Sequence, residues 1–137
     1  MASGCVFCAI IAGDVPATMV MRDDDVAAFL DARPLFKGHV LVVPRAHTPT
    51  LYDVPPAALG TLFAGVQRIA RAVEAGLGVD GTFVAMNNKV SQSVPHLHVH
   101  VVPRKRKDGL RGFFWPREPY ADDAEREAFA AKIRAAL

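Results

Sequence analysis

Three histidines alternate with apolar residues in the run Pro-His-Leu-His-Val-His-Val-Val, which occupies residues 95–102. In an extended strand, successive side chains point to opposite faces, and every second residue lies ~6.6 Å further along the same face. The run therefore predicts a strand with a row of imidazoles on one face and Leu and Val side chains facing the core. The histidines of the row are His96, His98 and His100.

The spacing also limits what these histidines can bind together. The outer two would lie ~13 Å apart along a strand, which is too far for both to reach one tetrahedral zinc ion through bonds of ~2 Å. One or two of the three could be metal ligands. The others would be free for acid–base or nucleophilic chemistry, for which a neutral imidazole near pH 7 is suited.

The rest of the chain predicts an α+β fold. A 137-residue chain suits a single domain over 1–137. Apolar residues recur on one helical face from Leu59 to Val73, which predicts a long helix that begins near the N-cap Asp53 and ends near Gly76. Hairpin-length connections favour an antiparallel sheet of about five strands with helices packed on one side. The strands are expected over 18–22, 26–30, 38–44, 82–86 and 95–102.

Two shorter helices complete the predicted elements. One covers residues 7–12 and ends at Gly13. The other covers 122–136, where Asp122 and Glu125 resemble a capping box. Its expected core stripe consists of Phe129, Ile133 and Leu137. The segment 104–120 is expected to be irregular, and it carries the only tryptophan, Trp115.

Composition narrows the class of protein. No run of ~18 apolar residues is present, so no transmembrane segment is expected. The N-terminus lacks the basic and apolar regions of a signal peptide, so we expect a cytoplasmic location. A net charge of +2 gives little reason to expect nucleic-acid binding, although residues 104–111 form a local basic loop.

Polar groups precede the histidine row. Ser91, Gln92 and Ser93 offer hydroxyls, an amide and loop N–H groups, which can donate hydrogen bonds to phosphate oxygens. A nucleophilic imidazole beside neutral donors and a basic loop favours attack on phosphorus over attack on a carbonyl.

The segment Ser-Gln-Ser-Val-Pro-His-Leu-His-Val-His-Val-Val-Pro-Arg at 91–104 resembles the signature of the histidine triad (HIT) family of nucleotide hydrolases and transferases. The resemblance extends to Cys-Val-Phe-Cys-Ala-Ile-Ile-Ala-Gly-Asp at 5–14, Ala-Phe-Leu-Asp-Ala-Arg-Pro at 28–34 and Gly-His-Val-Leu-Val-Val-Pro-Arg-Ala-His at 38–47. It implies a HIT-like fold of the Hint or Fhit branch, a purine nucleotide substrate and a homodimer, in which Trp115 would be a candidate contact.

The resemblance also implies a reaction. His98 would attack the α-phosphorus and form a nucleotidyl-histidine, from which water would release the nucleoside monophosphate. His100 would contact the reacting phosphate, Ser93 would lie near the leaving group, and His39 would complete the cluster. The bond cleaved would belong to a phosphoramidate, an aminoacyl adenylate or a dinucleoside polyphosphate.

Further residues match the nucleotide-binding positions of the family. Asp31 would bind the ribose hydroxyls, while Phe29, Leu30 and Ile10 would form walls around the base. Taken without the family, those three apolar residues would be interpreted as core, and Asp31 as a turn residue. The group that would contact the nucleotide and its phosphate comprises His100, Gln92, Ser93 and either Asn87 or Asn88.

Cys5 and Cys8 form a Cys-x-x-Cys motif, which alone is weak evidence for a metal. Bacterial relatives carry a Cys₂His₂ structural zinc, and the resemblance implies His47 and His96 as its other ligands.

Two alternatives remain open at the level of sequence. The family usually has glycine where this chain has Ser91, and glycine permits a positive φ. That departure favours a zinc-stabilised nucleotide-binding module with little turnover. A nucleic-acid-binding protein that uses the basic loop would instead show steep salt dependence.

Overall fold

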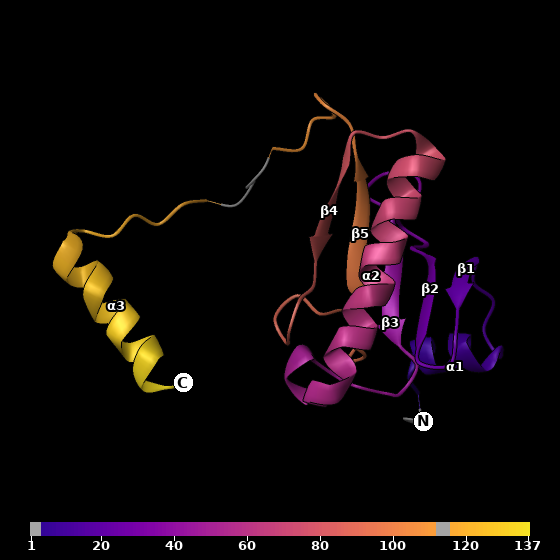
Figure 1. The fold of residues 1–137 in the computed structure, drawn as a ribbon, viewed down its shortest axis with the longest axis horizontal. Helices are drawn as coiled ribbons and strands as arrows, with labels where there is room; N and C mark the ends of the chain where they lie inside the picture. The colour runs from indigo at the N-terminus through magenta and orange to yellow at the C-terminus, as the bar shows by residue number, and fades with distance from the viewer. Residues whose placement is uncertain (1–3, 112–115) are drawn as a thin grey trace.

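A single antiparallel sheet of five strands, in the order β1-β2-β3-β5-β4, organises the molecule (Figure 1). The computed structural model describes residues 4–111 and 116–137. The strands are β1 (Met19–Arg22), β2 (Val26–Leu30), β3 (Val40–Pro44), β4 (Gly81–Ala85) and β5 (Val99–Arg104). The helices are α1 (Val6–Ala12), the short 3₁₀ helix η1 (Leu51–Asp53), α2 (Pro56–Leu77) and α3 (Asp123–Ala135).

These elements confirm the predicted α+β class. The strand predicted over 26–30 has those bounds, and the strands predicted over 18–22, 38–44 and 82–86 begin and end within two residues of them. The helix expected over 7–12 ends, as predicted, at Gly13, which has a φ of +87°. Within the described residues, no helix is both long and apolar enough to span a bilayer.

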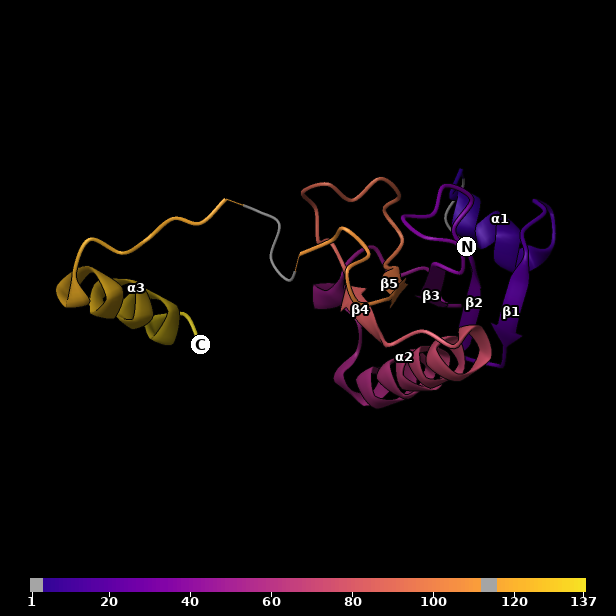
Figure 2. The same cartoon turned by 90° about the horizontal axis from the view of Figure 1, so that it is seen from above.

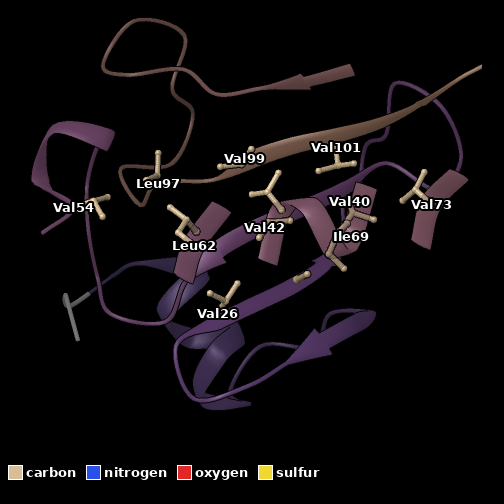
Figure 3. Packing of buried hydrophobic residues seen from close by; sticks show 12 residues of the cluster. Val26, Val40, Val42, Val54, Leu62, Ile69, Val73, Leu97, Val99 and Val101 are labelled. Carbon is tan, nitrogen blue, oxygen red and sulfur yellow. The ribbon is translucent and has the colours of Figure 1, made fainter. Parts of the chain in front are cut away.

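The long helix α2 covers one face of the sheet and forms the main core with it (Figure 2). Side chains of α2, such as Leu62 and Ile69, pack against every second residue of the central strands (Figure 3). The strand residues of this core include Val26, Val40, Val42, Val99 and Val101, each at most 2% exposed.

The opposite face of the sheet packs against α1. The strand residues on this face alternate along the chain with those that contribute to the main core. A second cluster joins Phe7 and Ile11 of α1 to Phe29, Leu41 and Val43 of the sheet. The expectation that the helices pack on one side of the sheet was therefore wrong, since α1 and α2 lie on opposite faces (Figure 2).

The strand predicted over 95–102 begins later than expected, at Val99. The reason is that Leu97 donates its backbone N–H to the carbonyl of Thr48, and His96 donates to Val94, so neither residue joins the sheet ladder. The predicted alternation of faces nevertheless continues through this segment. Leu97 lies fully buried in the core under α2.

The start of α2 also differs from the prediction. Pro55 occupies its N-cap and Pro56 its first turn, where a missing N–H costs nothing. Asp53 instead closes η1, where its carboxylate accepts hydrogen bonds from the backbone N–H and the hydroxyl of Thr50.

The C-terminal helix α3 begins as predicted, with the Asp122 side chain accepting from the Glu125 N–H. The expected core stripe was wrong, because α3 buries no residue and lies away from the sheet (Figure 1). Phe129, Ile133 and Leu137 are 50%, 64% and 100% exposed. Trp115, the candidate dimer contact, lies outside the described residues.

Candidate active site and metal cluster

A hollow of about 710 Å³ lies between α1, the C-terminal end of β2 and the histidine segment. It brings together seven of the residues predicted from the sequence, which are far apart along the chain. They are Ile10, Phe29, Leu30, Asp31, Ser93, His98 and His100. One wall is apolar, whereas the histidines, Asp31 and Ser93 form a polar end.

The hydrogen bonding of His98 determines which of its ring nitrogens can act as a nucleophile. Its Nδ1 lies 2.8 Å from the backbone oxygen of His96. A carbonyl oxygen only accepts hydrogen bonds, so Nδ1 carries the proton of the neutral ring. Nε2 of the neutral ring therefore keeps its lone pair, on a side chain that lines the hollow and is only 5% exposed.

His39 and His100 form a second hydrogen-bonded unit beside His98. The backbone N–H of Leu35 donates to His39 Nδ1 at 3.1 Å, so the neutral His39 ring carries its proton on Nε2. That N–H donates to His100 Nδ1 at 2.9 Å. The neutral His100 ring must then carry its proton on Nε2, as a potential donor to a substrate oxygen.

Burial keeps this second unit uncharged. Burial lowers the pKa of His39, and the nearby Asp31 carboxylate, 3.7 Å away, opposes the shift. Burial also lowers the pKa of His100 to about 4, with smaller contributions from His98 and His39. Both rings are therefore neutral near pH 7, as the direction of the hydrogen bonds requires.

Asp31 lies at the end of β2, where the chain turns away from the sheet. One carboxylate oxygen, Oδ1, accepts from the Arg33 N–H in a turn, and Oδ2 is the oxygen nearest His39. Asp31 is thus both a turn residue and a member of the hollow, so the two interpretations of this position are compatible. The base-wall candidate Phe29 likewise belongs both to the hollow and to the second core cluster, against which Ile10 packs. Leu30 lines the hollow but is 36% exposed, so the interpretation of this residue as core was wrong.

The loop before the histidines holds three further predicted residues, Asn87, Asn88 and Gln92, which lie outside the lining of the hollow. Asn88 accepts from the Leu51 N–H, and Gln92 bonds to Lys89 N and to Pro49 O, so these side chains tie the loop to η1 and its flanking residues. The Asn87 amide donates to the carbonyl of Ser91.

Ser91 itself has a φ of +59°, the left-handed conformation that glycine adopts without strain. The serine therefore takes the backbone shape that a glycine permits, at a cost of about 1–2 kcal/mol. Ser93, two residues further along the chain, lies in the lining of the hollow.

Ten of the seventeen lining residues were not predicted as part of a site, and an aromatic and a cationic residue are among them. Phe7 packs edge-on against the His98 ring at 5.1 Å and against Phe29 at 5.3 Å. Arg33 adds a cationic residue to the lining. Both lie inside segments that carry the family resemblance, Phe7 in the Cys-x-x-Cys motif and Arg33 in the run 28–34, and this position could have drawn attention to them.

A separate cluster lies on the other side of His96 and contains all four predicted metal ligands. Cys8 Sγ lies 3.4 Å from His47 Nδ1 and 3.6 Å from His96 Nδ1, and Cys5 Sγ lies 3.4 Å from His96 Nδ1. All four ligand atoms lie within 4.8 Å of one another.

The donor set of this cluster fits a zinc ion. His96 Nε2 lies 2.7 Å from the carbonyl of Pro44 and must donate to it, so the bare Nδ1 of His96 faces the two sulfurs. Two thiolates and two imidazoles form a closed tetrahedral set for zinc, and a second hydrogen bond that orients a histidine ligand is typical of such sites. A bound zinc would join α1, through Cys5 and Cys8, to the loops that carry His47 and His96.

The sheet, the histidine cluster and the Cys₂His₂ set together define the class of protein. Residues 12–107 match the model of the HIT domain, and the chain belongs to the HIT family. A HIT-like protein of Mycobacterium tuberculosis is 44% identical over 138 residues, which cover 97% of this chain and 92% of that protein.

Solved structures support the same assignment. A HIT family protein from Bacillus subtilis is 34% identical, with a TM-score of 0.88 and 98% of both chains covered. A Zn-bound histidine triad family protein from Mycobacterium smegmatis is 40% identical, with a TM-score of 0.75 and 98% of both chains covered.

Several relatives have names that state an activity. An adenosine 5'-monophosphoramidase of Schizosaccharomyces pombe is 29% identical over 95% of this chain and 98% of that protein. The adenylylsulfatase HINT3 of Arabidopsis thaliana is 37% identical, with 77% of this chain and 55% of that protein covered. These names and the family support nucleotide hydrolysis as the general class of activity.

Proposed function

We propose that the chain cleaves a bond at a nucleoside α-phosphate through a nucleotidyl-His98 intermediate and releases the nucleoside monophosphate. The substrate would be a purine nucleoside phosphoramidate or a dinucleoside polyphosphate. The observation that carries the proposal is the hydrogen bond from His98 Nδ1 to the His96 carbonyl, which leaves the Nε2 lone pair available to attack phosphorus.

The surrounding residues have roles that follow from their positions. In this proposal His100 donates from Nε2 to a nonbridging phosphate oxygen, because its Nδ1 already accepts from His39. Asp31 binds the ribose hydroxyls, and Ile10, Phe29 and Leu30 enclose the base. The Ser93 hydroxyl lies at the polar end of the hollow, where it can donate to the leaving group.

Attack by His98 forms an Nε2–phosphorus bond as the bond to the leaving group breaks. Water then attacks the same phosphorus and displaces the imidazole, which regains its lone pair. Dividing the displacement into two steps through a histidine is an established route to faster group transfer. Electrostatic stabilisation of the phosphoryl oxygens by donors such as His100 lowers the barrier of each step.

We further propose that the Cys₂His₂ cluster holds one structural zinc ion per chain. Zinc there would supply folding energy by linking α1 to the rest of the domain, and it would leave the four ligands unavailable for catalysis. Among the histidines that flank the nucleophile, His96 would then be structural and His100 reactive.

We also propose that residues 1–137 form one HIT domain that functions as a homodimer. The exposed apolar residues Phe129 and Ile133 of α3, with Leu137 just after it, support this assembly, because exposed apolar patches commonly mark protein–protein contacts. Sedimentation of the full chain would test it, with a monomer mass as the contradicting result.

The experiment that tests the activity measures release of AMP from an adenosine phosphoramidate and from a diadenosine polyphosphate. Wild type should release AMP, whereas His98→Ala should release none and still bind AMP. Glu74→Ala, an exposed change on α2, is the matched control and should behave as wild type. Turnover that survives in His98→Ala would contradict the proposal, and AMP binding by wild type without turnover would indicate a binding module.

A further inference from the structure

We infer that Cys5 and Cys8 form a redox-modification site, at which a hydroperoxide converts the two metal-binding thiolates into a disulfide, releases the zinc ion and slows the chemistry at His98. The inference rests on the proposed function for its effect on turnover.

The two sulfurs are arranged for disulfide formation by the helix that carries them. Cys5 is the N-cap of α1 and Cys8 is three residues further on. Side chains at these two positions approach each other across the first turn, as they do in a capping box. Here the Cys8 N–H donates to Cys5 Sγ at 3.4 Å, so the Cys5 sulfur lies directly above the turn that holds Cys8.

The surroundings of the two cysteines distinguish the sulfur that meets the oxidant from the sulfur that resolves the reaction. Cys5 is partly exposed and lines a second hollow, of about 320 Å³, together with Gly4, His47 and Ser93. Cys8 is 2% exposed. A small peroxide can therefore reach Cys5, while Cys8 is placed to attack the oxidised sulfur from within the protein.

The reaction balances with the hydroperoxide as the only oxidant. The Cys5 sulfur attacks the terminal peroxide oxygen, the O–O bond breaks, and the sulfur becomes a sulfenic acid as an alcohol or water leaves. Cys8 sulfur then attacks Cys5 sulfur, forming the S–S bond and displacing the sulfenic oxygen as water. In total the two thiolates lose two electrons, and the peroxide gains two electrons and takes up two protons from solvent to leave as one alcohol (or water) and one water.

Disulfide formation removes two of the four ligands of the metal. The imidazoles of His47 and His96 alone bind zinc far more weakly than the complete set, so the ion dissociates. The His96 ring then loses the metal from its Nδ1 side, and its Nε2 hydrogen bond to Pro44 and its edge-on contact with Phe7 remain.

His96 connects the metal cluster to His98, because its side chain belongs to the cluster and its backbone carbonyl bonds to the His98 ring. The backbone carbonyl of His96 is the acceptor that fixes the proton of His98 on Nδ1. Because the side chain of His96 is anchored by the metal cluster, loss of that anchor lets the carbonyl move and allows the His98 ring to reorient. Loss of a residue that orients a reactive group typically costs 10- to 100-fold in activity.

The test uses the full-length, zinc-loaded protein and hydrogen peroxide as the probe. Three measurements are taken along a titration: zinc released to a chromophoric chelator, the intact mass, and the imidazole N–H resonance of His98 in ¹⁵N-histidine-labelled protein, assigned by its absence in His98→Ala. We expect one zinc ion released per disulfide formed, with loss of the protected His98 N–H resonance. Dithiothreitol and zinc together should restore both, which a methionine sulfoxide would not allow.

Turnover is measured in parallel, and kcat should fall about tenfold with little change in KM, because the nucleophile is misoriented while the nucleotide hollow is retained. Cys5→Asp is the matched control, because aspartate is both a zinc ligand and a good N-cap but cannot form a disulfide. Its bound zinc and its His98 resonance should resist the same peroxide treatment.

Two results would overturn the inference: zinc that stays bound while peroxide oxidises other residues, or zinc release that leaves the His98 resonance and kcat unchanged. If the untreated protein shows no turnover, the proposed function fails, and the metal, mass and resonance measurements still decide the redox site. If Cys5→Asp does not bind zinc, the reversibility in wild type decides it.

Discussion

Replacing His39 tests whether the proton arrangement of the His39–His100 unit matters for turnover. In His39→Ala, His100 Nδ1 loses the only donor that residues 4–111 and 116–137 offer it, the His39 Nε2–H at 2.9 Å. The neutral His100 ring is then free to carry its proton on Nδ1 and to present a lone pair to the phosphate. A donor to a developing negative charge is replaced, in part of the population, by an acceptor that repels it.

The size of the effect follows from the energy of one such hydrogen bond. Hydrogen bonds to charged groups contribute about 1.5–3 kcal/mol, and each 1.36 kcal/mol of barrier is a tenfold change in rate. We therefore expect His39→Ala to lower kcat/KM about 10- to 100-fold for an adenosine phosphoramidate. His39 is 3% exposed, so thermal unfolding of the variant is measured alongside to separate destabilisation from chemistry.

His39→Gln is the informative partner of the alanine variant. The glutamine amide reaches about as far as the imidazole Nε2 and can donate to His100 Nδ1, so it should recover most of the lost activity. If His39→Gln is no more active than His39→Ala, the loss of activity does not come from the missing N–H donor. An alanine variant within about twofold of wild type would refute the relay, since the expected loss is at least tenfold.

Three further predictions concern stability. Removing zinc with a chelator should lower Tm, because Cys5 and Cys8 then no longer link α1 to the rest of the domain. Metal analysis before the treatment should find one zinc ion per chain, and an unchanged Tm would contradict a structural ion. The pKa of His100 falls from 6.5 in the unfolded chain to about 4 in the folded protein. Between these two pH values the unfolded chain therefore binds more protons at this residue than the folded protein does. The free energy of unfolding should therefore decrease as the pH is lowered from 6.5 to about 4, and His100 should account for on the order of 3 kcal/mol of that decrease. Denaturant titrations of wild type and His100→Gln over this pH range would check the effect. Leu97→Ala should cost about 2–5 kcal/mol in denaturant unfolding, because Leu97 is fully buried beneath α2, and a loss of under about 1 kcal/mol would mean that the core closes around the gap.

The elements whose bounds depend on neighbouring residues in the sequence could be predicted well from the sequence alone. β2 has its predicted bounds because its apolar run is bracketed by a turn and by Asp31. The Cys₂His₂ set and seven of the seventeen residues that line the hollow were also anticipated, since the family resemblance supplies contacts between residues that are distant in sequence. The pattern of residues alone would have left Phe29 and Leu30 as core.

The features that were missed depend on partners outside the local sequence. The strand containing His100 starts late because Leu97 bonds to Thr48, which lies 49 residues away. The stripe on α3 has the spacing of a buried helix face, but spacing does not specify what the face packs against. The proton positions in the His39–His100 unit follow from the N–H of Leu35, a backbone group that no side-chain pattern reveals.

The alternation at residues 97–101 has a consequence for how such a chain can change length. Leu97, Val99 and Val101 face the main core, while the residues between them face the hollow. Inserting or deleting a single residue here would exchange the two faces, placing imidazoles in the core and valines in the site. A change of length in this stretch therefore disturbs both faces at once, whereas a substitution affects only one of them. The exposed residues 116–121 face neither the core nor the hollow, so that part of the chain tolerates a change of length far better.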